Sequence, residues 1–166
     1  MTQIYFQGNP IQTNSDLPSI GQIAPDFYLV NQQLQTVTLA NYINKRKILH
    51  IVPSIDTPTC ALSTRKFNEK AAHLLNTVIL IISADLPFAQ ARFCEMEGLN
   101  HLIFLSTFRS QFAQDYGLLL IDGLLAGLTA RAVFILDTDN KILYTELVSE
   151  LTDEPNYNQA LAIFKS

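Results

Sequence analysis

The stretch KILHIVPSIDTPTC (residues 47–60), followed by the run ALSTRKFNEKAAHLL, decides the fold of this chain of 166 residues. Its first six residues are almost continuously apolar, as expected for a strand that is buried on both faces of a sheet. The run after Cys60 has the spacing of an amphipathic helix. The buried face of that helix is expected to carry Leu62, Phe67, Ala71 and Leu74 or Leu75. The stretch therefore predicts a strand, a short loop and a helix, with Cys60 in the first turn of the helix.

The segments on either side repeat this alternation and then depart from it. Two more strand–helix pairs follow, and the chain closes with two strands around the turn TDN and a final helix. In order, these segments are TVILIISAD (77–85), PFAQARFCEMEG (87–98), HLIFLST (101–107), SQFAQDYG (110–117), ARAVFILD (130–137), KILYTEL (141–147) and DEPNYNQALAIFK (153–165). Upstream, QIYFQGNPIQT (3–13) predicts a hairpin around a Gly-Asn turn, and FYLVN and TVTLA predict short strands.

Parallel strand–helix units followed by an antiparallel hairpin and a closing helix predict an α/β fold of the thioredoxin-like type. We expect a central mixed β-sheet flanked by helices, with an N-terminal β-hairpin. A flavodoxin-like sheet is the competing layout, and the late hairpin counts against it. No repeat, low-complexity stretch or linker is visible, so residues 1–166 are expected to form a single domain.

Composition excludes several classes of protein. The net charge is −4, and the longest basic run, NKRK (44–47), is too short for a nucleic-acid surface. The apolar segments are too short or too interrupted to span a bilayer, and the N-terminus does not resemble a signal peptide. The two cysteines, Cys60 and Cys94, are therefore expected in a reducing, cytoplasmic location, where a cysteine pair is more often catalytic or redox-sensing than structural.

The residues before Cys60 predict how its thiol is placed. With Thr57 as the N-cap and Pro58 as the first helical residue, Cys60 is the third residue of the helix, where free backbone N–H groups favour an anion. A free thiol is only about 3% ionised at pH 7. The helix terminus contributes roughly 0.3–1 kcal/mol toward ionisation, which leaves most of a thiol protonated, so a reactive Cys60 needs a cation nearby.

Four arginines are candidates for that cation: Arg65, Arg92, Arg109 and Arg131. Arg131 is the most informative because it lies at the start of the otherwise apolar strand ARAVFILD, where a charged side chain calls for a specific explanation. A purely structural role for both residues stays open at this point. A cysteine near a helix start is often a small buried hydrophobe, and an arginine at a strand edge is often simply solvated. The pattern favours a reactive thiol and leaves its reaction unnamed.

The stretch PSIDTPTC contains Pro-x-x-x-Thr-x-x-Cys and resembles the peroxidatic motif of the peroxiredoxins. The segments FQGNP, ISADLPFAQARFCEMEGL, STFRSQFAQDYG and IDGLLAGLTARAVFILD are similar to the bacterial thiol peroxidase group, the atypical two-cysteine peroxiredoxins. The similarity covers nearly the whole chain. Two departures stand out: Thr59 replaces a small apolar residue, and Glu95-Met96 replaces the Gly-Ala that often follows the second cysteine.

The resemblance implies a thiol-dependent peroxidase that reduces hydrogen peroxide and organic (alkyl or lipid) hydroperoxides in antioxidant defence. Cys60 would be the peroxidatic nucleophile and form a sulfenic acid, with Thr57 and Arg131 holding the peroxide and Pro53 shielding the sulfur. Cys94 would be the resolving cysteine and close a redox-active Cys60–Cys94 disulfide. Thioredoxin would reduce that disulfide, and relatives of this kind lead us to expect a homodimer.

A disulfide requires Cα atoms about 4.4–6.8 Å apart, whereas packed helices lie about 8–10 Å apart axis to axis. We therefore expect one or both cysteine segments to unwind partly on oxidation, which unchanged helices in both redox states would contradict. The alternative function is a thioredoxin-fold redox sensor or binding module without efficient turnover.

Neither the resemblance nor the motifs imply a cofactor or a metal. The three histidines are scattered, no Cys-x-x-Cys or glycine-rich phosphate loop is present, and DTDN (137–140) lacks the remainder of a calcium loop.

Overall fold

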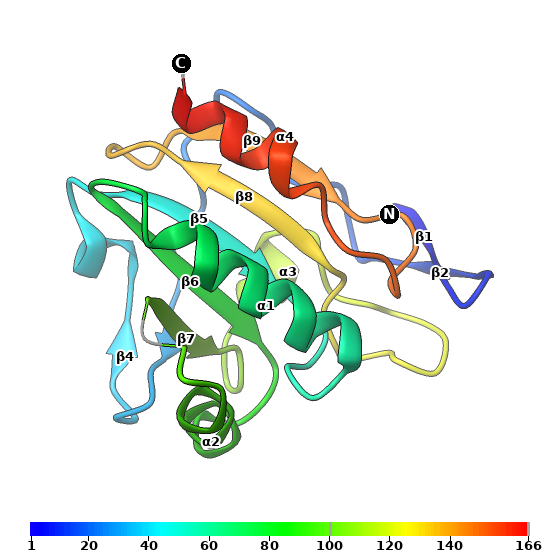
Figure 1. Cartoon of the computed structure of the whole chain (residues 1–166). Coiled ribbons are helices and arrows are strands. Elements are labelled where there is room, and N and C mark those ends of the chain that lie inside the picture. Colours follow the sequence, from blue (N-terminus) through cyan, green and yellow to red (C-terminus); the bar gives the residue numbers. More distant parts are fainter. Residues whose placement is uncertain (100, 166) are drawn as a thin grey trace.

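The computed structural model describes residues 1–99 and 101–165, and Figure 1 shows a twisted sheet with helices on both faces. Seven strands lie in the order β4-β3-β7-β6-β5-β8-β9. Their bounds are β3 Leu29–Val30, β4 Thr36–Val37, β5 Arg46–Ile51, β6 Thr77–Ser83, β7 Leu102–Ser106, β8 Ala132–Leu136 and β9 Ile142–Leu147. The three central strands β5, β6 and β7 are parallel; β8 pairs antiparallel with β5, and β9 pairs antiparallel with β8. The predicted mixed sheet of thioredoxin-like type is confirmed.

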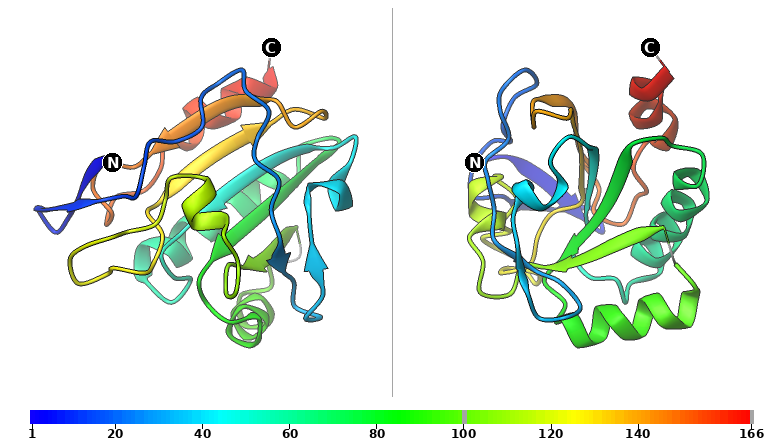
Figure 2. Two further views of the ribbon diagram at one scale, coloured as in Figure 1. Left: turned by 180° about the vertical axis from the view of Figure 1, so that it is seen from behind. Right: turned by 90° about the vertical axis from the view of Figure 1, so that its left-hand side faces the viewer.

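Helices cover the two faces of the sheet unequally. The helices α1 (Pro58–Ala71), α2 (Pro87–Glu97) and α4 (Tyr157–Ala162) lie on one face, where their apolar side chains pack around β5, β6 and β7. A 3-10 turn, η2 (Ile163–Lys165), extends α4. The short helix α3 (Phe112–Asp115) and the long N-terminal segment cover the other face, as Figure 2 shows from behind and edge-on. The sheet therefore separates two apolar clusters.

The short N-terminal hairpin pairs β1 (Gln3–Phe6) with β2 (Asn9–Gln12). Its turn is Gln7-Gly8 rather than the expected Gly-Asn, because these two residues take the positive φ angles, 51° and 81°, that a tight two-residue hairpin turn demands. The hairpin is anchored to residues 149–151 by the backbone bonds Tyr5 N to Ser149 O and Leu151 N to Tyr5 O. It thus braces the segment that follows β9.

The buried face of α1 differs from the expectation in one respect. Leu62 is 38% exposed and Leu75 is 82% exposed, while Phe67 is buried and Leu74 is half-buried, as expected. The other inward positions are Cys60, Ser63 and Thr64, which are fully buried. Small and polar side chains therefore form part of the buried face of α1, which hydrophobic periodicity alone did not predict. The Ala71 side chain, expected on the same face, lies outside the described residues.

No helix among the described residues has both the length and the apolar character that crossing a membrane requires.

Candidate active site

Helix α1 begins at the residues that the sequence indicates. Thr57 is the N-cap in extended conformation, Pro58 is the first helical residue, and Thr57 Oγ1 accepts a hydrogen bond of 3.3 Å from the Cys60 N–H. The same hydroxyl donates to the Ser54 carbonyl oxygen at 3.2 Å. Both bonds hold the first turn rigidly, and they place Cys60 at the positive end of the helix dipole.

The sulfur of Cys60 is buried and lies beside a cation. Arg131 Nη1 donates a hydrogen bond of 3.1 Å to Cys60 Sγ, and Arg131 Nε donates one of 3.0 Å to the Leu151 carbonyl oxygen. Both side chains are almost inaccessible to solvent, with exposed fractions of 0% for Cys60 and 2% for Arg131. One planar guanidinium thus binds the Leu151 carbonyl oxygen and the Cys60 sulfur at the same time.

The strand register explains how Arg131, 71 positions downstream, reaches Cys60. Strand β8 pairs antiparallel with β5, and Ile51 lies opposite Ala132. Arg131 therefore lies beside Val52, at the carboxyl end of β5, where the loop to α1 begins. The other candidates lie elsewhere: Arg65 pairs with Glu97, Arg92 is exposed on α2, and Arg109 lies over the ring of Phe108.

Pro53 is buried at the start of the loop between β5 and α1. The preceding residue, Val52, is fixed on both sides: its N–H donates to the Ile82 carbonyl oxygen at 2.9 Å, and its carbonyl oxygen accepts from Thr129 Oγ1 at 3.0 Å. Because Pro53 has no N–H to satisfy, it can be buried here without leaving an unpaired donor. The loop leaves the sheet in a defined direction toward Thr57.

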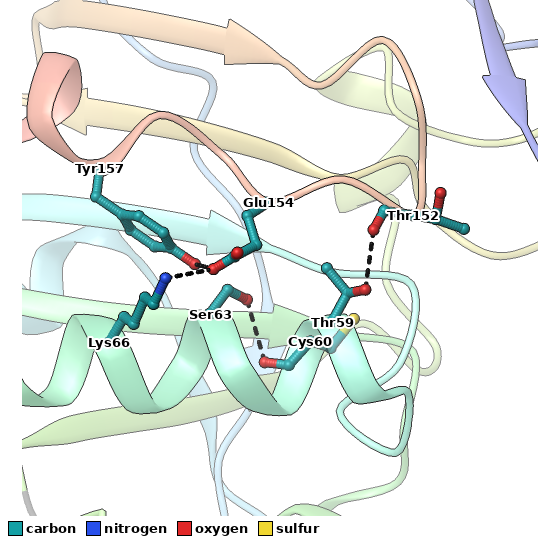
Figure 3. Close-up of polar contacts among 7 residues, drawn as sticks. All are labelled: Thr59, Cys60, Ser63, Lys66, Thr152, Glu154 and Tyr157. Carbon is teal, nitrogen blue, oxygen red and sulfur yellow. Dashed lines mark hydrogen bonds and ion pairs between the residues drawn. The ribbon is translucent and has the colours of Figure 1, made fainter.

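Helix α1 is also tied to the segment after β9, as Figure 3 shows. Thr59 Oγ1 donates a hydrogen bond of 2.9 Å to the Thr152 carbonyl oxygen, and Lys66 Nζ lies 2.9 Å from the Glu154 carboxylate. The Tyr157 hydroxyl donates to that same carboxylate at 2.9 Å. This contact explains Thr59, one of the two departures from the family pattern. Its hydroxyl holds the first turn of α1 to Thr152, next to the Leu151 carbonyl oxygen that binds Arg131.

The second cysteine lies on α2 and is not joined to the first. Both thiols are free, and the partly buried Cys94 Sγ donates to the Leu99 carbonyl oxygen at 3.4 Å. Cys94 lines a pocket of about 270 Å³ together with Tyr42 and Phe104. Both α1 and α2 are intact helices around their cysteines. The structure thus describes the dithiol form of the chain.

A hollow of about 420 Å³ separates the two cysteine helices. Thr57, Pro58 and Ala61 line it from the α1 side, and α2 contributes Ala89, Arg92, Phe93, Met96 and Glu97. Phe93 contributes an aromatic ring to this hollow. Phe27, Phe112 and Tyr116 are buried in the core behind the sheet, and Phe88 is exposed. The hollow adjoins the first turn that carries Cys60 and has room for a small organic molecule.

The match to known proteins agrees with this geometry. The family model described as Redoxin matches residues 19–161. Two curated relatives named thiol peroxidase, from Leptospira interrogans serovars copenhageni and Lai, are each 48% identical over 165 residues, covering 98% of this chain and 96% of the relative. The chain belongs to the Redoxin family. Its relatives place it in the bacterial thiol peroxidase group, and it is a peroxiredoxin-type oxidoreductase with thiol-dependent peroxidase activity.

Solved structures of Redoxin relatives share the fold. A peroxiredoxin-like protein from Aquifex aeolicus is 36% identical, with a TM-score of 0.94 over 99% of this chain and 96% of that one. A thiol peroxidase from Chromobacterium violaceum, 23% identical, superposes with a TM-score of 0.92 over 98% of this chain and 95% of that one, which supports the fold. The thioredoxin-like architecture predicted from the order of the elements is therefore that of the family.

Two parts of this Redoxin site carry no signal in the sequence. The Leu151 carbonyl oxygen, which anchors Arg131, is a backbone atom, so residue type does not reveal it. The Thr152 carbonyl oxygen, which holds Thr59, is hidden for the same reason. Among the described residues, no group of three or more His, Cys, Asp and Glu side chains is arranged to hold a metal ion.

A buried histidine beneath the site makes stability depend on pH. His50, on β5, packs its ring 4.8 Å from the Phe67 ring, and neither ring nitrogen has a hydrogen-bond partner in the described part of the chain. Burial first, and the charge of Arg131 second, lower the pKa of His50 from 6.5 to about 3. His50 is therefore neutral in the folded protein at pH 7.

Because the folded pKa lies below the unfolded one, the unfolded chain binds a proton more readily between pH 6.5 and pH 3. The free energy of unfolding is expected to fall as pH drops through that window, by an amount of the order of 4 kcal/mol for this group. Urea unfolding at pH 7 and pH 4 measures it, with His50→Leu as the comparison variant. The variant should lose less stability than the unaltered chain between these pH values, and an equal loss would contradict the assignment.

Proposed function

We propose that Cys60 is the peroxidatic cysteine and that Arg131 and Thr57 act with it on the hydroperoxide. The observation that carries this proposal is the 3.1 Å hydrogen bond from Arg131 to Cys60 Sγ inside a buried first turn. The thiolate sulfur would bond to the terminal peroxide oxygen while the O–O bond breaks. Cys60 becomes a sulfenic acid, and the other oxygen takes a proton and leaves as water or an alcohol.

The positions of the supporting groups suit this step. The guanidinium of Arg131 can stabilise negative charge on the sulfur and on the departing oxygen, since it is fixed by the Leu151 carbonyl oxygen before the peroxide arrives. The Thr57 hydroxyl lies at the same turn and would exchange its bond to Ser54 for one to the peroxide. Pro53, buried in the loop, would keep bulk water away from the sulfur.

The second half of the cycle would use Cys94. Its thiol would attack the Cys60 sulfenic acid, which forms the Cys60–Cys94 disulfide and releases water. Because the two cysteines start on separate intact helices, at least one helix end would unwind first. A thioredoxin dithiol would then reduce the disulfide and become oxidised itself.

The proposed substrate range is supported by the hollow between α1 and α2, where Phe93, Met96 and Ala89 lie beside the polar residues Arg92 and Glu97. The apolar side chains would accommodate the organic part of an alkyl or lipid hydroperoxide, and hydrogen peroxide needs less room. We further propose a single-domain chain that works in the cytoplasm as a homodimer, in keeping with the thiol peroxidases it resembles.

The test is a coupled assay with thioredoxin, thioredoxin reductase and NADPH. The unaltered chain is expected to consume hydrogen peroxide and cumene hydroperoxide over many turnovers, with NADPH oxidised in equal amount. Cys94→Ser is expected to react once with peroxide and stop, leaving a Cys60 sulfenic acid that dimedone traps and mass spectrometry locates.

The same assay separates the enzyme from the alternative, a redox sensor. A sensor would form the disulfide and yet show no sustained NADPH oxidation. Continued turnover in Cys94→Ser with thioredoxin would show that Cys94 is not the resolving residue. Peroxidase activity with other thiols alone would leave the family assignment intact and overturn the proposed reductant.

A further inference from the structure

Asp85 lies between the two cysteine segments and is linked to both by hydrogen bonds, directly to the loop before Cys60 and through Ser83 and Gln90 to helix α2. It lies two residues after the end of β6 and two residues before the first residue of α2. Its carboxylate is partly buried and accepts three hydrogen bonds: from Ser54 Oγ at 2.8 Å, from the Ile55 N–H at 2.8 Å and from Ser83 Oγ at 2.7 Å. All three partners donate, so the Asp85 carboxylate accepts every one of these bonds.

From Asp85, hydrogen bonds lead in three steps to Cys60. The carboxylate holds the hydroxyl and the N–H of the pair Ser54-Ile55, at the middle of the loop after β5. The Ser54 carbonyl oxygen accepts from the Thr57 hydroxyl at 3.2 Å, and that hydroxyl accepts from the Cys60 N–H at 3.3 Å. The orientation of the Thr57 hydroxyl therefore depends on where Asp85 holds Ser54.

A second set of bonds leads from Asp85 to the helix of Cys94. The Ser83 hydroxyl, which donates to Asp85, accepts from Gln90 Nε2 at 3.0 Å. Gln90 is fully buried and also donates to the Leu105 carbonyl oxygen at 2.9 Å. Gln90 precedes Cys94 by four residues, one helical turn, so both lie on the same face of α2. One carboxylate thus joins the loop before Cys60 to the helix face that carries Cys94.

We propose that Asp85 is a positioning residue for the peroxidase reaction. By fixing Ser54 and Ile55, its carboxylate orients the Thr57 hydroxyl toward the first turn of α1 and so prepares the place where the hydroperoxide binds. Asp85 does not touch the sulfur in any described contact and acts through Ser54 and Thr57. This inference rests on the proposed role of Cys60 as the peroxidatic cysteine.

The positioning role of Asp85 predicts a loss of rate that is specific to the reaction of Cys60 with peroxide. Asp85→Asn replaces one accepting oxygen by an amide N–H₂, which can keep its contact only to a hydroxyl that reverses its role and accepts, so the hydrogen bonds around this side chain are weakened and the loop shifts. We expect the second-order rate constant of Cys60 with hydrogen peroxide to fall about 10- to 100-fold, in line with the sensitivity of reactions to small misplacement of catalytic groups. Alkylation of Cys60 by iodoacetamide at pH 7 needs the thiolate and no oriented hydroxyl, and should stay within about threefold.

The experiment measures both rates by rapid quench and mass spectrometry in Cys94→Ser protein, so that Cys60 reacts alone. Asp26→Asn is the matched control: its carboxylate also accepts two backbone N–H groups, of Phe27 and Leu39, in the part of the molecule behind the sheet. This control should leave the ratio of the two rates unchanged. Ser54→Ala removes a single contact to Asp85, and we expect it to lower the ratio about three- to tenfold.

The outcomes distinguish the positioning role of Asp85 from the proposed role of Cys60, on which it rests. An unaltered ratio in Asp85→Asn overturns the positioning role, as does an equal fall of both rates, which would indicate general loss of structure. If Asp85→Asn fails to fold, an unaltered ratio in Ser54→Ala overturns the role instead. If Cys60 in the parent protein does not react with peroxide at all, the proposed function fails, independently of Asp85.

Discussion

Replacing Cys60 by Ser is expected to reduce peroxide consumption in the thioredoxin-coupled assay to the rate measured without the protein. An alcohol oxygen cannot be oxidised to a sulfenic acid, so neither the first step nor the disulfide that follows it is available. The fold should survive, because Ser differs from Cys by one atom, and the Arg131 guanidinium can donate to Ser Oγ as it does to Sγ. Thermal unfolding checks the fold, and NADPH oxidation checks the activity.

The matched control is Cys94→Ser, which removes the other thiol from a partly buried place on α2. It should retain one stoichiometric reaction with peroxide, whereas Cys60→Ser should retain none. Full turnover by Cys60→Ser would show that another group reduces the peroxide. The Cys60 assignment, including every role derived from its contacts, would then be wrong.

Replacing Arg131 by Met is expected to lower the second-order rate constant with hydrogen peroxide about 10²- to 10³-fold, the usual loss when one charge-stabilising donor is removed. Met keeps the apolar stem of the side chain and removes both the bond to Cys60 Sγ and the bond to the Leu151 carbonyl oxygen. Some loss of stability is also expected, about 1–3 kcal/mol, because that buried carbonyl loses its partner. Stopped-flow competition kinetics measures the rate, and urea unfolding measures the stability.

Two further variants define what Arg131 contributes. Arg131→Lys retains the charge, but an ammonium group lacks the planar fork that reaches Leu151 and Cys60 together, so we expect only partial recovery, to within about tenfold of the parent rate. Arg109→Met removes an exposed arginine that lies over the Phe108 ring, and it should change neither rate nor stability appreciably. A parent-like rate in Arg131→Met would exclude this residue from the reaction.

Much of the fold follows from patterns within a few residues of each other. The buried strands β5 and β6 are visible as apolar runs, α2 is bounded by Pro87 and Gly98, and the start of α1 is marked by Thr57 and Pro58. Periodicity was less reliable on the face of α1, where Ser63 and Thr64 are buried and Leu62 is exposed. Periodicity reports hydrophobicity and not the size of the space that a side chain must fill, so it cannot identify small polar side chains that fit a close-packed interior.

Sequence alone determined that Cys60 lies in the first turn of a helix, because a helix cap and a first-turn proline are local features that need no distant partner. It also indicated that Cys60 requires a cation, and it singled out Arg131 as the charge that opens an apolar strand. Tertiary structure decided that Arg131 reaches the sulfur, that the Leu151 carbonyl oxygen holds it there, and that Asp85 joins the two cysteine segments. The physical reason is that these contacts depend on the pairing of β8 with β5 and of β6 with β5, and strand register is a property of the whole sheet rather than of any one segment.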